Sequence, residues 1–131
     1  MSIIYRWEIP NRVLWVDVGA KMSLAEVHAM DNTLTAYLDA CDKPLHIIFD
    51  NTTLATFPTD VRVLAATVQF PKHPNLGWRV IYGESKLVRF LGQLSSKIIA
   101  ATRFRYVDDL TTAYAFLQSI DNTLAMPKAI D

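Results

Sequence analysis

Residues 83–86 read Gly-Glu-Ser-Lys and combine three features of an anion-binding corner: a glycine turn, a serine suited to cap a helix, and a lysine. Free backbone amides at a helix N-terminus attract anions, and a nearby cation adds to that attraction. Ser85 and Lys86, together with Arg79 and Arg89, are therefore candidate contacts for an anionic ligand. The spacing differs from that of a phosphate-binding P-loop, and an ordinary turn between a strand and a helix has the same pattern.

The side chains that usually build catalytic or metal sites form no recognisable pattern. His28 lies on the first expected helix, His46 in a strand and His73 between two prolines, and no two of them are spaced to share one helical face as metal ligands do. Cys41 has aspartates near it, and their negative charge disfavours the reactive thiolate. The Gly-x-Ser-x-Gly motif of serine hydrolases is absent from the sequence. We therefore expect no enzymatic activity, no cofactor and no metal ion.

Composition narrows the class of protein further. The chain has 131 residues, of which 51% are hydrophobic, enough for one compact domain with its own core. Its 13 basic and 13 acidic residues cancel, which argues against a dedicated nucleic-acid-binding protein. The single cysteine excludes an intramolecular disulfide and is typical of a reducing compartment. Because the sequence has neither a signal-peptide pattern nor an apolar run of about 20 residues, we expect a cytoplasmic protein without a membrane span.

Hydrophobic periodicity predicts five strands and four helices in the order β-β-α-β-α-β-α-β-α. Alternating or continuous apolar runs indicate strands at 3–9, 13–18, 45–49, 78–82 and 104–107. Apolar residues at helical spacing indicate helices that begin at the capping residues Ser23 (with Glu26 completing a capping box), Thr59, Ser85 and Asp109. This alternation is typical of an α/β domain whose mixed, mostly parallel five-stranded sheet is covered by helices and opens with an antiparallel hairpin. We place the single domain at 1–121 and a loose tail at 122–131.

The third of these helices carries more apolar residues than one buried stripe needs. The excess indicates a second contact surface, either for another copy of the chain in a homodimer or for a lipid in a cleft. The residues that would form this surface are Phe90, Leu91, Leu94 and Ile98.

Two segments carry patterns of a known family. In 45–59, an apolar strand ends at Asp50, and an eight-residue loop leads to Thr59 at the start of a helix. In 103–117, a strand leads to Asp109 and to a closing helix. Together with the order of elements, these segments resemble the STAS fold of sulfate-transporter tails and bacterial anti-sigma-factor antagonists. The stretch 72–84 is also similar to a STAS/lipid-exchange-like subgroup of unassigned bacterial proteins.

The resemblance implies a non-enzymatic regulatory module that binds a protein partner, with Thr59 as phosphoacceptor and switch and with Asp50 and Asp60 as contacts. In the antagonists, an Asp precedes the phosphorylatable Ser, and Ser/Thr-Gly-Leu follows it. Here Pro58 stands in place of that Asp, and Asp60-Val61 replace the small residue and the glycine. A phosphate on Thr59 would meet repulsion from Asp60, whereas the free amides of a helix start would favour it. The alternative function is binding of a lipid or another anionic amphiphile beside the third helix.

Overall fold

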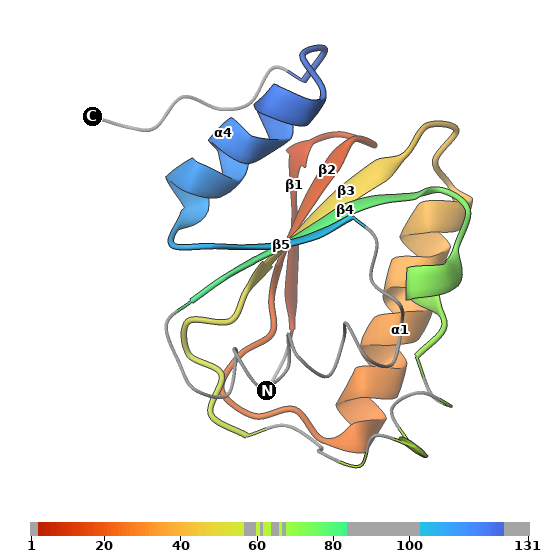
Figure 1. The fold of residues 1–131 in the computed structure, drawn as a ribbon. Coiled ribbons are helices and arrows are strands. Elements are labelled where there is room, and N and C mark those ends of the chain that lie inside the picture. Colours follow the sequence, from red (N-terminus) through yellow and green to blue (C-terminus); the bar gives the residue numbers. More distant parts are fainter. Residues whose placement is uncertain are drawn as a thin grey trace.

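The computed structural model describes residues 3–56, 60, 62–63, 66, 68–83 and 103–124. These residues form an α/β arrangement around a five-stranded mixed sheet (Figure 1). β1 runs antiparallel to β2, and all other neighbouring strands are parallel, as the sequence predicts. The strands lie side by side in chain order: β1 (Ile4–Ile9), β2 (Val13–Asp17), β3 (Leu45–Asp50), β4 (Leu76–Tyr82) and β5 (Phe104–Val107).

Two of the four expected helices are confirmed, α1 (Leu24–Asp39) and α4 (Leu110–Ile120). A short 3-10 helix, η1 (Phe70–Lys72), precedes β4. Residues 62–63 and 66 are helical, whereas the third expected helix lies outside the described residues. β4 begins at Leu76, two residues before the predicted start, because Leu76 pairs with Leu45 of β3.

Both confirmed helices begin at the capping residues that the sequence predicts. The Glu26 amide donates to Ser23 Oγ over 3.1 Å, and the Ser23 amide donates to Glu26 Oε1 over 3.0 Å, which completes the capping box. At the start of α4, Asp109 Oδ1 accepts from the amide of Thr112 over 2.8 Å and from its hydroxyl over 2.7 Å. Each cap satisfies amides that have no partner within the helix.

The two helices lie on opposite faces of the sheet (Figure 1). Leu14 and Val16 of β2 pack in the cluster that contains α1, while Val13 and Trp15 pack in the cluster that contains α4. A strand covered on both faces needs apolar residues at successive positions, which explains the continuous apolar runs in β2 and β3. Leu124 is buried in the α4 cluster, so packing continues past residue 121.

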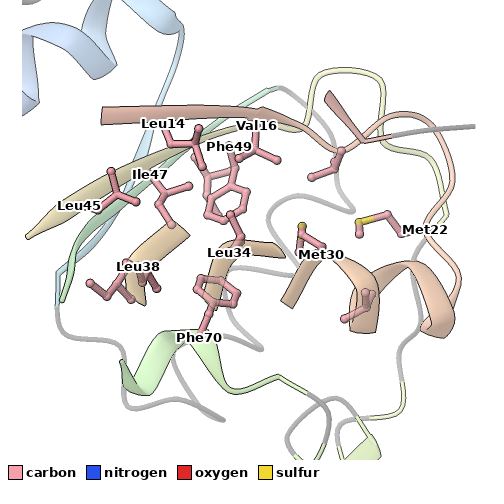
Figure 2. Packing of buried hydrophobic residues seen from close by; sticks show 14 of the residues in the cluster. Leu14, Val16, Met22, Met30, Leu34, Leu38, Leu45, Ile47, Phe49 and Phe70 are labelled. Carbon is pink, nitrogen blue, oxygen red and sulfur yellow. The ribbon is translucent and has the colours of Figure 1, made fainter. Parts of the chain in front are cut away.

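The larger core lies between α1 and the sheet (Figure 2). Leu34 and Leu38 of α1 are fully buried in the same cluster as Ile47 and Phe49 of β3. Phe70 of η1 belongs to this cluster, and its ring centroid lies 6.2 Å from that of Phe49. η1 therefore contributes Phe70 to the core between α1 and the sheet, in contact with both α1 and β4.

A buried carboxylate connects α1 to η1. Asp31 has an exposed fraction of 3%, and its Oδ1 accepts from the amide of Gln69 over 2.7 Å and from the amide of Phe70 over 2.8 Å. These amides stand at the start of η1, where no helical partner is available to them. Asp31 therefore fixes the end of the long connection between β3 and β4.

The chain after α4 is fastened to the edge of the sheet at which the parallel strands begin. Arg12 Nη2, in the turn between β1 and β2, forms an ion pair with Asp121 Oδ2 over 2.6 Å. His46 Nε2 lies 3.9 Å from the same oxygen, and His46 Nδ1 accepts from the amide of Trp78 over 2.9 Å. A Cβ at Gly77 would overlap the His46 imidazole, so glycine is required there.

Candidate functional site at the carboxyl edge of the sheet

Parallel strands that end side by side place their last residues along one edge of the sheet. Asp17 at the end of β2 pairs in register with Asp50 at the end of β3, and Asp50 pairs with Tyr82 at the end of β4. In open α/β sheets, ligands bind outside the carboxyl ends of the strands. Asp50, which the sequence singles out, therefore stands where a binding site is expected.

The Asp50 carboxylate joins the loop that follows β3 to the neighbouring strand. Its Oδ1 accepts from the amide of Thr52 over 3.0 Å and from the Thr52 hydroxyl over 2.6 Å. The pKa of Tyr82 is raised to about 12, mainly by burial and also by the charge of Asp50 and a hydrogen bond to it, while the hydrogen bond with Trp15 opposes the shift. Trp15 Nε1 donates to the Tyr82 hydroxyl over 2.9 Å. Tyr82 is thus held protonated between an indole donor and a carboxylate acceptor.

A β-bulge in β1 brings a second carboxylate to the same face. The register between β1 and β2 shifts between Trp7 and Ile9, which leaves Glu8 as the extra residue. The Glu8 side chain is only 8% exposed, and its Oε1 lies 2.9 Å from Arg6 Nη2. The pKa of Tyr114 in α4 is raised, first by burial and then by its hydrogen bond to Glu8. The bulge therefore positions Glu8 between β1 and α4.

Arg6 connects Glu8 to the residues around Asp50, because it pairs with Glu8 and lies over the ring of Trp15. Its guanidinium carbon lies 4.1 Å from the centroid of the Trp15 ring, a cation–π distance, while the side chain is still 54% exposed. We use the name edge cluster for the six residues that these interactions connect across β1, β2, β3, β4 and α4: Arg6, Glu8, Trp15, Asp50, Tyr82 and Tyr114.

The side chains of the edge cluster offer hydrogen-bonding and charged groups. With a pKa near 12 for Tyr82 and a raised pKa for Tyr114, both phenols stay protonated at neutral pH and act as hydrogen-bonding groups. Arg6 presents a half-exposed guanidinium that is already oriented by Glu8 and Trp15. Within the part of the chain that the structure describes, no three His, Cys, Asp or Glu side chains come together as metal ligands.

Asp60 acts as a helix cap. Its Oδ1 accepts from the amide of Arg62 over 3.1 Å and from the amide of Val63 over 3.3 Å, the two amides that an N-cap side chain normally satisfies. The sequence predicts this role for Thr59, one residue earlier, and Thr59 lies outside the described residues. Because the carboxylate of Asp60 holds these amides, they are not free to bind a phosphate on Thr59.

Arg79, which the sequence analysis names as a candidate anion contact, lies in β4, within the strand predicted at 78–82. It is not a surface cation: it is 4% exposed and lies on the α1 face of β4, in register with Ile47 and Phe104. Burial lowers the pKa of its guanidinium to about 10. The residues proposed to accompany it in anion binding or to form a self-association surface lie outside the described residues: Ser85, Lys86, Arg89, Phe90, Leu91, Leu94 and Ile98.

Sequence reasoning missed most of the edge cluster. Trp15 and Asp17 alternate onto one face of their strand, and Asp50 and Tyr82 each end an expected parallel strand. The positions of Trp15, Asp50 and Tyr82 could therefore have been predicted from these patterns. The position of Glu8 could not have been predicted in this way, because the simple alternation of apolar residues in β1 does not reveal the bulge. Tyr114 depends on how α4 crosses the sheet, which no local pattern specifies.

None of the described helices is long and apolar enough to cross a membrane. The chain matches no protein-family model and no curated protein sequence.

Proposed function

We propose that the chain is a non-enzymatic, STAS-like interaction module that binds a protein partner at the carboxyl edge of its sheet. The observation that carries the proposal is the edge cluster, in which Asp50 contacts Tyr82 and Tyr82 is connected through Trp15 to Arg6 and Glu8 farther along the sheet. The proposed contacts are Asp50, Asp60 and the hydroxyl of Thr59. The STAS-like part of the proposal rests on the sequence resemblance of segments 45–59 and 103–117.

The electrostatics of the cluster favour binding over catalysis. A general acid or base works best when its pKa lies near the working pH, whereas the pKa of Tyr82 is about 12. The Glu8 carboxylate is occupied by Arg6, and Tyr82 is occupied by Trp15 and Asp50. Groups that satisfy each other in this way form a rigid surface, which lowers the entropy cost of binding a partner.

Phosphorylation of Thr59 is the proposed switch. A phosphate adds a charge of about −1.5 to −2 at neutral pH. At Thr59 this charge would stand next to Asp60 and near the loop that Asp50 begins. In the proposed module, the added charge repels a partner that recognises the carboxylates of this edge.

The test compares variants at the two edges of the sheet. The partner is captured from a lysate with the full chain, identified by mass spectrometry, purified and titrated by calorimetry against four variants. Thr59→Glu and Asp50→Asn are expected to weaken binding about tenfold or more, Thr59→Ala to weaken it by less, through loss of the hydroxyl contact alone, and the control Asp42→Asn to leave it unchanged. Asp42 is exposed in the turn before β3, at the opposite edge. Equal affinities for Asp50→Asn, Thr59→Glu and Asp42→Asn would rule out the proposed contact surface.

A further inference from the structure

Arg79 is a buried cation in apolar surroundings. In the sheet it lies between Ile47 of β3 and Phe104 of β5, and its guanidinium carbon is 5.3 Å from the centroid of the Phe104 ring. Ile47 belongs to the α1 core cluster, and Phe104 packs against that cluster. The guanidinium therefore lies on the α1 face, whereas the edge cluster lies on the α4 face.

One nitrogen of the guanidinium lacks the hydrogen-bond partner that a buried polar atom normally has. Its Nε is buried and has no hydrogen-bond partner. Among the acidic side chains that the structure describes, none forms an ion pair with Arg79. Buried charges in proteins are almost always paired, and a buried polar atom without a partner often marks the place of an ion or ligand. With a pKa of about 10, the side chain remains positively charged at neutral pH.

The geometry points to Arg79 as the anchor of an oxyanion, a carboxylate or phosphate group, carried by a ligand with an apolar chain. A guanidinium binds such a group through two parallel N–H donors, and its Nε takes part in one of the two common arrangements. Ile47 and Phe104 surround the cation with apolar surface, which suits the chain of an amphiphile. This site and the edge cluster lie on opposite faces of the sheet. The proposed oxyanion site therefore does not depend on the proposed protein-binding function.

The experiment follows the thermal unfolding of the full chain with four probes: dodecyl phosphate, dodecanoate, inorganic phosphate and uncharged dodecanol. Dodecyl phosphate and dodecanoate are expected to raise the Tm, and Arg79→Met is expected to weaken their binding about tenfold or more, as for the loss of a charge-assisted pair. An equal response to inorganic phosphate identifies free phosphate as a sufficient source of the oxyanion. A response to the two amphiphiles alone identifies a lipid-like source.

Arg105→Met is the matched control, because Arg105 lies on the neighbouring strand but on the α4 face, in register with Val80 and over the Phe116 ring. This variant should bind the probes as the wild type does. Replacing Arg79 with Met removes an unpaired buried charge, so the variant is expected to stay folded, and circular dichroism checks this before titration. Native mass spectrometry then counts the bound probe in each variant.

Three outcomes would overturn the assignment. In the first, dodecanol raises the Tm as much as the charged amphiphiles do. In the second, Arg79→Met and Arg105→Met lose affinity equally. In the third, none of the four probes changes the Tm of the wild type.

Discussion

Single buried polar side chains determine how the connections of this protein are held. Asp31 illustrates the principle, since one carboxylate oxygen serves two backbone amides that have no other partner at the start of η1. Trp15 of β2 likewise holds Tyr82 of β4, because its indole N–H donates a hydrogen bond to the Tyr82 hydroxyl. Such groups contribute through the cost of leaving their partners unsatisfied, which exceeds the net gain of a hydrogen bond at the surface.

Replacement of Asp31 by alanine is expected to lower the free energy of unfolding by about 3 kcal/mol, because one buried and one part-buried amide lose their carboxylate acceptor. Asp31→Asn keeps an oxygen at the same position and should cost about half as much. Urea denaturation measures both values, with Asp42→Ala as an exposed control. If Asp31→Ala costs no more than Asp42→Ala, the carboxylate does not hold η1.

Among the elements, β1 has a double role. It is an edge strand of the described sheet, and the bulge at Glu8 interrupts its regular pairing pattern. Bulges in edge strands discourage pairing with strands of other molecules, and they can redirect a side chain toward a site. Here the redirected side chain is Glu8, which connects β1 to Tyr114 of α4.

A double-mutant cycle tests that connection between the two elements. Glu8→Ala and Tyr114→Phe each remove one side of the hydrogen bond, so their effects on the free energy of unfolding should be non-additive by about 1 kcal/mol. Ser119→Ala is the matched control on α4, because the Ser119 hydroxyl donates to the Phe116 carbonyl within the helix. Glu8→Ala and Ser119→Ala should add. Additivity in both cycles would show that Glu8 does not hold α4.

For the molecule as a whole, the fastening of α4 couples stability to pH. The pKa of His46 is lowered, first by burial, then by the charges of Arg12 and Arg103, while Asp121 opposes the shift. The folded protein therefore keeps His46 neutral, with Nδ1 free to accept from the Trp78 amide. In the unfolded chain, His46 takes up a proton near its ordinary pKa of 6.5.

The stability that neutral His46 provides is therefore complete above pH 6.5 and is lost as the pH falls toward the lower folded pKa, because protons then favour the unfolded chain. The free energy of unfolding should fall between pH 6.5 and 5 by at most about 1.4 kcal/mol per pH unit from this group. His46→Gln should flatten the profile. His28→Gln, at an exposed position of α1, should keep it. Identical profiles for the wild type and His46→Gln would contradict the mechanism.

The sequence by itself determined the order of the five strands, the helices α1 and α4, the opening hairpin, and the caps at Ser23 and Asp109. These features follow from local hydrophobic periodicity and from side chains that bond to amides three residues away. The position of Asp50 at the end of a buried parallel strand followed from the same pattern.

Only the tertiary structure decided the rest of the candidate sites. The bulge in β1 orients the Glu8 side chain, and the way α4 crosses the sheet brings Tyr114 close to it. The register of β3, β4 and β5 places Arg79 between Ile47 and Phe104, where it is buried. None of these is encoded in a short window, because register and bulges are set by pairing between distant strands. A one-residue difference in that pairing moves a side chain to the opposite face of the sheet.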